Sequence, residues 1–251
     1  MEAKPKEQKA IILAAGRGSR LMPYTKNVPK CLIDFEGKTF LQHQLETLLS
    51  VGIKDVTIVT GYLAHKIEEA CQPYKTKIKF TFFNNPDYET TGTLNSMALT
   101  REEFQTDHFN GDLILINSDI IFKKSCLENV LHCKNTCVTM ELGRHEVGAT
   151  CVKVDQDKVV DMGFLDHYDA SGLSVGIVKF AGRNVKEVKK FLTNYPPTIH
   201  SYVFHIIKHL IGQKVPVNYS LCEYGKWCEI DSPADLKLYE HTIPSILKLR
   251  K

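Results

Sequence analysis

The stretch Lys-Ala-Ile-Ile-Leu-Ala-Ala at residues 9–15, followed at once by Gly16-Arg17-Gly18-Ser19-Arg20, decides the fold class of this chain. Its first part is a short, nearly continuous apolar run, which is typical of a strand buried on both faces. Gly16 closes the run and opens a loop with two glycines one residue apart. Backbone without side chains can bring N–H groups against phosphate oxygens. The stretch therefore predicts a buried strand that ends in a phosphate-binding loop.

The rest of the first half alternates between apolar runs and amphipathic stretches. Leucines recur at helical spacing from Leu41 to Leu49, and Gly52 is a plausible stop for that helix. Further strands are expected at 56–60, 78–83 and 113–116, and further helices at 63–70 and 93–101. This β-α-β-α rhythm predicts a Rossmann-like α/β fold with a mixed, mainly parallel sheet and helices on both faces.

The pattern changes after about residue 138. Strands are expected at 137–141, 150–154, 175–180 and 215–219, with an amphipathic helix at 202–210 between the last two. We interpret this half as a small antiparallel excursion. Because we find no repeat, low-complexity tract or long linker, we expect residues 1–251 to form one domain.

Composition excludes several classes of protein. The 32 Lys and Arg nearly balance the 29 Asp and Glu, so neither nucleic acid nor a membrane surface is an expected partner. The charged N-terminus lacks the apolar core of a signal peptide, and the eight cysteines show no framework spacing. We therefore expect a cytoplasmic protein with reduced thiols. Cys133 and Cys137 have the spacing of half a zinc site, but no second half exists and ordinary thiols are the better interpretation.

Two basic residues accompany the glycine loop. Arg20 and Lys30 could neutralise a triphosphate and the charge that develops on its α-phosphorus, and Lys30 is expected in a solvent-facing loop. The alternative is a tight turn followed by surface basic residues. The loop is not a P-loop, and Leu21 stands where the dinucleotide fingerprint has its third glycine.

Carboxylates occur where a hard metal ion would need them. Asp119 follows a buried strand directly, and Glu229 and Asp231 point to one face if residues 228–231 are extended. Magnesium prefers such oxygen ligands. The alternatives are that Asp119 is a turn residue and that Asp231 or Ser232 caps a helix that begins near Pro233.

These motifs together resemble the sugar-phosphate nucleotidyltransferase superfamily, most closely its bacterial phosphocholine and aminoethylphosphonate cytidylyltransferases. The superfamily signature Leu-Ala-Ala-Gly-x-Gly-x-Arg-Leu-x-Pro-x-Thr, then Pro-Lys, is complete over residues 13–30. The closing motif Trp-x-Glu-Ile-Asp occupies residues 227–231. The middle motif at 88–96 is intermediate between the sugar and phosphocholine types, and Phe164 replaces a lysine that many relatives carry.

The resemblance implies roles for named residues. Lys30 and Arg20 would be catalytic, and Asp119, Glu229 and Asp231 would bind Mg²⁺. Acceptor contacts would come from Tyr168, Lys179 and Trp227, although Trp227 is equally well interpreted as a core residue. The implied nucleotide contacts are Leu13, Ala14, Ala15, Gly16, Gly18, Ser19, Arg20, Lys30, Gly61, Tyr88, Thr91, Asn95 and Ser96.

The resemblance implies a magnesium-dependent nucleotidyltransferase. The phosphate or phosphonate of a small, phosphocholine-like acceptor would attack the α-phosphorus of a nucleoside triphosphate, with CTP expected, and pyrophosphate would leave. A sugar-1-phosphate nucleotidyltransferase is the alternative that Gly92-Thr93 supports, and a catalytically dead nucleotide-binding regulator is a third. Retention of all five charged site residues argues against the third. A homo-oligomer is compatible with this function.

Overall fold

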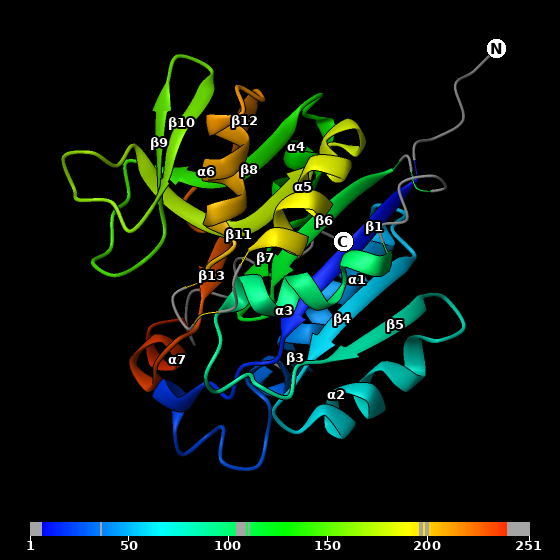
Figure 1. Cartoon of the computed structure of the whole chain (residues 1–251). Coiled ribbons are helices and arrows are strands. Elements are labelled where there is room, and N and C mark those ends of the chain that lie inside the picture. Colours follow the sequence, from blue (N-terminus) through cyan, green and yellow to red (C-terminus); the bar gives the residue numbers. More distant parts are fainter. Residues whose placement is uncertain are drawn as a thin grey trace.

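The structure, a computed structural model, describes residues 7–239 except 36, 104–108, 110, 196–197 and 199–200. Its main sheet has nine strands, and one half of it is parallel (Figure 1). The order across this half is β5-β4-β1-β6. The strands are β1 Gln8–Ala14, β4 Asp55–Thr60, β5 Lys79–Asn84 and β6 Asp112–Asn117. The predicted strands therefore exist within one or two residues of their expected bounds.

The other half of the sheet begins where β11 pairs antiparallel with β6. It comprises β8 Thr136–Leu142, β9 Cys151–Asp155, β10 Lys158–Gly163, β11 Gly172–Phe180 and β12 Val217–Leu221. The β9–β10 hairpin extends beside β11, at the upper left of Figure 1. The mixed sheet with an antiparallel excursion is thus confirmed.

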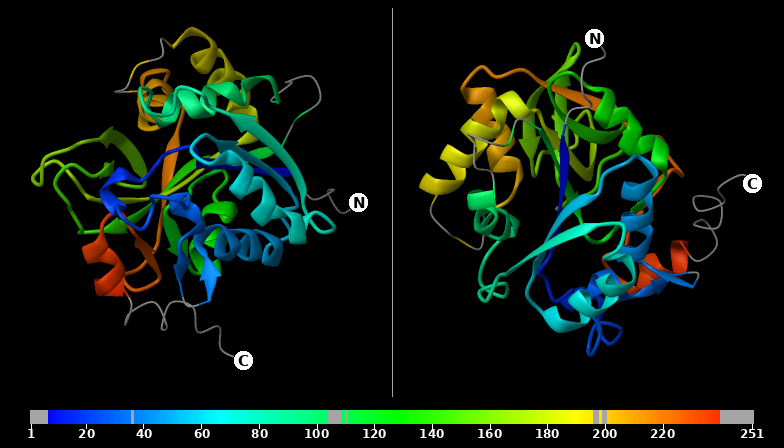
Figure 2. Two further views of the ribbon diagram at one scale, coloured as in Figure 1. Left: turned by 90° about the horizontal axis from the view of Figure 1, so that it is seen from below. Right: turned by 90° about the vertical axis from the view of Figure 1, so that its right-hand side faces the viewer.

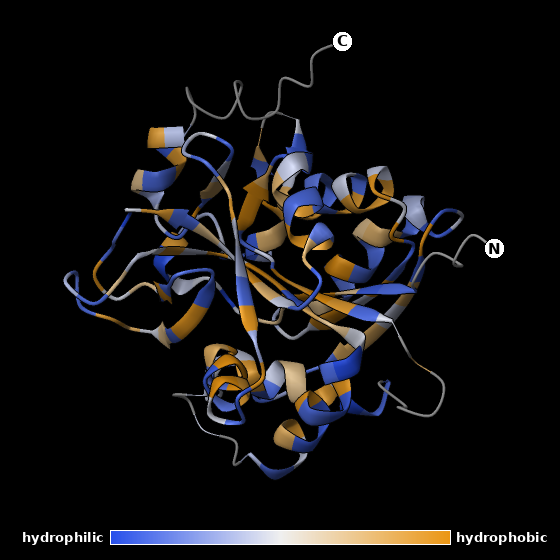
Figure 3. Ribbon diagram, turned by 90° about the horizontal axis from the view of Figure 1, so that it is seen from above, coloured by the Kyte–Doolittle hydropathy of each residue, from blue (hydrophilic) through white to orange (hydrophobic). Residues whose placement is uncertain are grey.

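Helices cover both faces of the sheet, as predicted (Figure 2). One face carries α1 Phe40–Ser50, α2 Ala64–Cys71 and α4 Lys124–His132, and the other carries α3 Thr93–Leu99, α5 Gly182–Asn194 and α6 Phe204–Gly212. The alternation of side chains along β1 explains this division. Ala10 and Ile12 pack in the core under the helices of the first face, whereas Ile11 and Leu13 pack in the core under the helices of the second face. Figure 3 shows the resulting hydrophobic strands between more hydrophilic helix surfaces.

Most of the smaller elements were not predicted. These are the strand pairs β7 Ile120–Phe122 with β13 Trp227–Glu229 and β2 Asp34–Phe35 with β3 Lys38–Thr39, and the 3-10 helices η1 Ser19–Leu21, η2 Lys30–Leu32, η3 Gln72–Tyr74 and η4 Arg101–Glu103. The helix α7 Pro233–Tyr239 is the one that the sequence offered as an alternative, beginning near Pro233. Strands of two or three residues carry too little periodicity to be found in a sequence. The strand β10 and the helices α4 and α5 also escaped prediction.

One cysteine pair contradicts the expectation of eight thiols. Cys126 in α4 and Cys222, just after β12, form a disulfide with their Cα atoms 5.1 Å apart. These residues are 96 positions apart in the chain, so only the packing of α4 beside β12 brings them together. The other six cysteines are free.

No helix in the described part of the chain has the length and apolar character needed to cross a lipid bilayer.

Candidate active site

The predicted site residues meet at the carboxyl edge of the parallel strands. In the sheet register, Leu13 of β1 lies opposite Asn117 of β6, and Ala14 lies opposite Thr60 of β4. The glycine loop after β1, Gly61 after β4 and Asp119 after β6 therefore lie at one edge. Ligands of open α/β sheets bind at this edge.

Three carboxylates converge there. Asp119, Glu229 and Asp231 each offer an oxygen, and these oxygens lie within 4.8 Å of one another. The pairing of β13 with β7 positions them, because Glu229 lies opposite Ile120 and the Ile230 amide donates to the Asp119 carbonyl at 3.1 Å. The structure thus brings the three predicted metal ligands together. That these three carboxylates bind magnesium stays a prediction.

Two observations fit this cluster to a divalent cation. Asp119 Oδ1 is buried and accepts no hydrogen bond from the described residues. Burial, and then the neighbouring Asp119 and Asp231 carboxylates, raise the pKa of Glu229 to about 8. A carboxylate whose ionisation is opposed in this way gains from a cation, and oxygen ligands suit magnesium.

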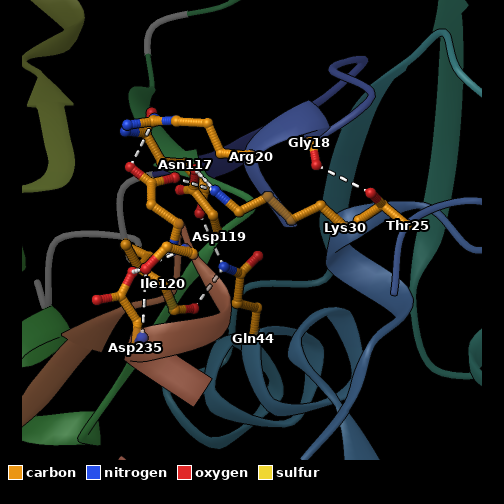
Figure 4. Close-up of polar contacts among 11 residues, drawn as sticks. Gly18, Arg20, Thr25, Lys30, Gln44, Asn117, Asp119, Ile120 and Asp235 are labelled. Atoms are coloured by element: carbon orange, nitrogen blue, oxygen red, sulfur yellow. Dashed lines mark hydrogen bonds and ion pairs between the residues drawn. The ribbon is translucent and has the colours of Figure 1, made fainter. Parts of the chain in front are cut away.

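Lys30 and Arg20 contact the same carboxylates (Figure 4). Lys30 Nζ donates to Asp119 Oδ2 at 2.8 Å and to Asp231 Oδ1, while Arg20 Nη2 donates to Asp231 Oδ2 at 2.7 Å. Although burial favours the neutral amine, Asp119 and Asp231 raise the pKa of Lys30, so it carries its charge. Lys30 is only 9% exposed. The expected solvent-facing position is therefore wrong, because two carboxylates draw the ammonium into the site.

The alternative that Asp231 caps a helix is excluded. Ser232 Oγ accepts from the Asp235 amide at 3.3 Å, and the Asp235 carboxylate accepts from the Ser232 amide at 2.7 Å. This reciprocal pair is a capping box at the start of α7. Ser232 is thus the cap, and the Asp231 side chain is left for Lys30 and Arg20.

Two glycines shape the predicted nucleotide loop. Gly18 has φ +68°, in the left-handed region, and a Cβ there would lie 3.0 Å from Lys30 Cβ. Thr25 Oγ1 donates to the Gly18 carbonyl at 2.9 Å and holds the turn. A Cβ at Gly61 would lie 2.7 Å from the Ala15 carbonyl oxygen. Both positions need glycine for close approach of backbone or side chain.

The middle motif is organised by Asn85, which sequence reasoning missed. Asn85 Nδ2 donates to Thr91 Oγ1 at 3.2 Å and to Ser96 Oγ at 3.1 Å. Thr91 and Ser96, predicted to contact the nucleotide, thus support the loop internally. Asn95 Nδ2 is different, because it is buried with no hydrogen-bond partner among the described residues. Tyr88 packs against Tyr62 with ring centroids 6.2 Å apart.

A cavity of about 520 Å³ opens beside the carboxylates. Arg20, Asp119, Glu229 and Asp231 line one part of it. The other predicted nucleotide contacts do not line it: Leu13, Ala14 and Ala15 are buried, and Gly16 and Ser19 are exposed on the adjacent loop. The basic and acidic side chains of the site thus line one part of a larger cavity.

Comparison with known proteins identifies the family. The nucleotidyl transferase model matches residues 9–175, which include the glycine loop, Lys30 and Asp119. The chain belongs to the nucleotidyl transferase family. As a nucleotidyltransferase, it transfers a nucleotidyl group.

Relatives of this nucleotidyltransferase act on different acceptors. It is similar to CTP:phosphoglutamine cytidylyltransferase of Campylobacter jejuni, at 26% identity over 91% of this chain and 98% of that protein. It is also similar to a probable mannose-1-phosphate guanylyltransferase of Oryza sativa, at 32% identity over 92% of this chain and 64% of that protein. Among solved structures, the inositol-1-phosphate CTP transferase from T. maritima shares its fold, with a TM-score of 0.80 at 21% identity over 98% of this chain and 99% of that one.

Two predicted acceptor contacts of the nucleotidyltransferase are wrong. The Lys179 side chain is buried and donates to the Leu131 carbonyl at 3.2 Å and to that of Cys133. The neighbouring Val178 lines the cavity, so strand alternation turns Lys179 to the opposite face. Trp227 is buried as well, and its Nε1 donates to Glu141 Oε2 at 2.7 Å.

Tyr168, the third predicted acceptor contact, is 99% exposed and does not line the cavity. Three other aromatic residues do: Phe164, Tyr202 and Phe204. The Phe164 ring lies edge-on to Tyr202 and Phe204, at centroid distances of 5.0 and 5.3 Å. Of these three residues the sequence pointed only to Phe164, because it stands where many relatives have a lysine.

Two supporting residues also escaped prediction. Gln44 Nε2 donates to the carbonyls of Asn117 and Ile120, both at 2.8 Å, and so holds the turn that carries Asp119 (Figure 4). The sequence did offer one signal for Gln44: it is a polar residue among the leucines of the buried face of α1. Glu146 lines the cavity and is held by Arg144, whose Nε donates to Glu146 Oε1 at 2.9 Å.

Proposed function

We propose that this nucleotidyltransferase is a magnesium-dependent cytidylyltransferase whose acceptor is a small phosphate or phosphonate with an amine or quaternary ammonium group. The observation that carries this proposal is the shared cavity. It joins the carboxylate cluster and Arg20 to the aromatic group Phe164, Tyr202 and Phe204. A charged phosphate end and a cationic, apolar end of one small molecule match these two parts.

The reaction asks for charge and position rather than for a base. The acceptor phosphate is already an anion, so it can attack the α-phosphorus in line while pyrophosphate leaves. Arg20 and Lys30 supply positive charge at the edge of the cavity, and Asp119 and Asp231 hold both in place. Magnesium held by Asp119, Glu229 and Asp231 would neutralise and orient the phosphates.

The aromatic group favours a cationic acceptor. Aromatic faces attract alkylammonium groups by about 0.5–2 kcal/mol each. Glu146 adds a carboxylate to the same cavity. CTP is favoured by the resemblance to cytidylyltransferases and by the relative that is a CTP:phosphoglutamine cytidylyltransferase. The buried, unpartnered Asn95 Nδ2 offers a donor for a base carbonyl oxygen.

A sugar-1-phosphate nucleotidyltransferase is the second candidate. The Gly92-Thr93 pair and the similarity to a mannose-1-phosphate guanylyltransferase favour it. The aromatic group would then face a sugar ring, and Glu146 its hydroxyls. The two candidates differ in whether a positive charge on the acceptor raises turnover.

Pyrophosphate release separates the candidates. Four nucleoside triphosphates are tested with phosphocholine, aminoethylphosphonate and a set of hexose 1-phosphates. We expect CTP with an amine acceptor to give the highest kcat/KM. A hexose 1-phosphate that wins by about tenfold, or about 1.4 kcal/mol, would establish the second candidate. No release with any pair would favour a nucleotide-binding regulator.

Substitution of Phe164 tests the aromatic pocket directly. Phe164→Leu keeps an apolar side chain but removes the ring, so kcat/KM for phosphocholine should fall about tenfold. Activity with a hexose 1-phosphate should fall much less. Leu221→Ala is the matched control, because Leu221 is 41% exposed and lies outside the cavity lining.

A further inference from the structure

Two free cysteines lie in contact outside the active site. Cys133 is the C-cap residue that directly follows α4, and Cys137 lies in β8. Their Sγ atoms are 2.7 Å apart, although the pair is not bonded. A disulfide needs about 2.05 Å, so a shift of well under 1 Å would bring the sulfurs to bonding distance. Neither residue lines the cavity of about 520 Å³.

The two thiols differ in access and acidity. Cys133 is half-buried, whereas Cys137 is fully buried. The hydrogen bond from Cys137 lowers the pKa of Cys133 to about 7, and the nearby Lys179 acts in the same direction. The same contact and burial raise the pKa of Cys137. A thiol of lowered pKa and partial exposure reacts first, and its buried neighbour can only follow.

The surroundings hold the pair in place. Lys179 Nζ donates to the carbonyls of Leu131 and Cys133 and so fixes the chain that leaves α4. The same helix is already joined to the segment after β12 by the disulfide of Cys126 and Cys222. Among the described residues, no third His, Cys or carboxylate completes a metal site beside the pair.

We propose that Cys133 and Cys137 form a reactive dithiol that exchanges with low-molecular-weight disulfides and closes to a second intramolecular disulfide. The Cys133 thiolate attacks one sulfur of the small disulfide, forms a mixed disulfide and releases one small thiolate. Cys137 gives its proton to a small thiolate and attacks Cys133 Sγ, which expels the second small thiolate. The protein dithiol loses two electrons, and the small disulfide becomes two thiols.

Peptide mapping after treatment with glutathione disulfide tests the proposal. Trypsin cleavage yields the peptides 125–134, 135–144 and 215–226, which carry Cys126 and Cys133, Cys137, and Cys222 respectively. Before treatment, only 125–134 and 215–226 should be joined, and Cys133 and Cys137 should be alkylated after denaturation. After treatment, all three peptides should form one linked species. The buried Cys151 should remain alkylatable throughout.

Two variants show the order of the steps. Cys137→Ser should keep glutathione attached to peptide 125–134, since no second thiol can expel it. Cys133→Ser should gain no glutathione on Cys137, because that thiol is buried. Where serine at the buried position unfolds the protein, Cys137→Ala replaces it. Wild-type protein that keeps both thiols alkylatable, or keeps glutathione on Cys133 without closing, would overturn the proposal. This readout needs no turnover, so it is independent of the proposed function.

Discussion

Lys30 lies between two carboxylates that are also candidate metal ligands. Its ammonium donates to Asp119 Oδ2 at 2.8 Å and to Asp231, so it neutralises the charges that a cation would meet. Mg²⁺ bound by Asp119 and Asp231 would therefore compete with Lys30 for these oxygens in the nucleotide-free protein. This competition separates the role of Lys30 in turnover from its effect on metal binding.

Lys30→Met should lower kcat by about 10²-fold, as for loss of one electrostatic stabiliser. The same change should tighten Mg²⁺ binding to the nucleotide-free protein on the order of tenfold, because two carboxylates lose their cation. Titration calorimetry measures the affinity, and thermal unfolding checks the fold. Lys38→Met is the control, since Lys38 pairs with Glu46 at 2.6 Å on the exposed surface. Weaker Mg²⁺ binding in the Lys30 variant would contradict the competition.

At the scale of elements, the loop after β1 contains two glycines with different demands. Gly18 has a positive φ and lies against Lys30, whereas a Cβ at Gly16 would meet no atom within 4 Å. Comparing substitutions at Gly18 and Gly16 therefore separates the effect of backbone strain from the effect of adding a methyl group to the loop surface.

Gly18→Ala should destabilise the protein by about 1–2 kcal/mol and reduce kcat, because the new methyl group strains φ and displaces Lys30. Gly16→Ala should leave the free energy of unfolding within about 0.5 kcal/mol of wild type. Urea unfolding measures both, and initial rates at saturating substrate report kcat. Equal stability of the two variants would show that the loop relaxes and that the left-handed turn is not required.

At the scale of the whole molecule, an ion-pair network lies at the edge of the sheet opposite the active site. Glu103 Oε2 accepts from Lys9 Nζ and from Thr57 Oγ1, both at 2.6 Å. Burial alone would raise the pKa of Glu103, but these hydrogen bonds outweigh it and the pKa is lowered. A lowered acid pKa contributes stability above the unfolded-state value, and that contribution is lost as the pH falls through the folded-state value.

Glu103→Gln should therefore cost on the order of 1–2 kcal/mol of unfolding free energy near neutral pH. The cost should shrink as the pH falls through the folded-state pKa of Glu103, which lies below the ordinary glutamate value, because the wild-type carboxyl then takes up its proton. Chemical denaturation across a pH series gives the difference curve, and kcat at pH 7 should not change. A difference that stays constant with pH would mean that the carboxylate charge contributes nothing.

The sequence predicted the elements whose signals are local. The apolar run at 9–15 became β1, and the leucine spacing of 41–49 became α1, because burial on both faces or on one helix face imposes a visible period. Asp119 could be placed at the site because carboxyl ends of parallel strands share one edge. Lys179 could not be placed, since a shift of one residue in a strand reverses the face of its side chain.

The sequence by itself determined the family, the α/β fold class and the residues at the ends of strands, all of which follow from periodicity and contiguous motifs. Only the tertiary structure decided which distant residues meet. Phe164 contacts Tyr202 in the cavity lining, Cys126 bonds to Cys222, and Lys30 binds both Asp119 and Asp231. Contacts of this kind depend on strand order and helix packing, because the sequence separation of two residues carries no record of their distance in space.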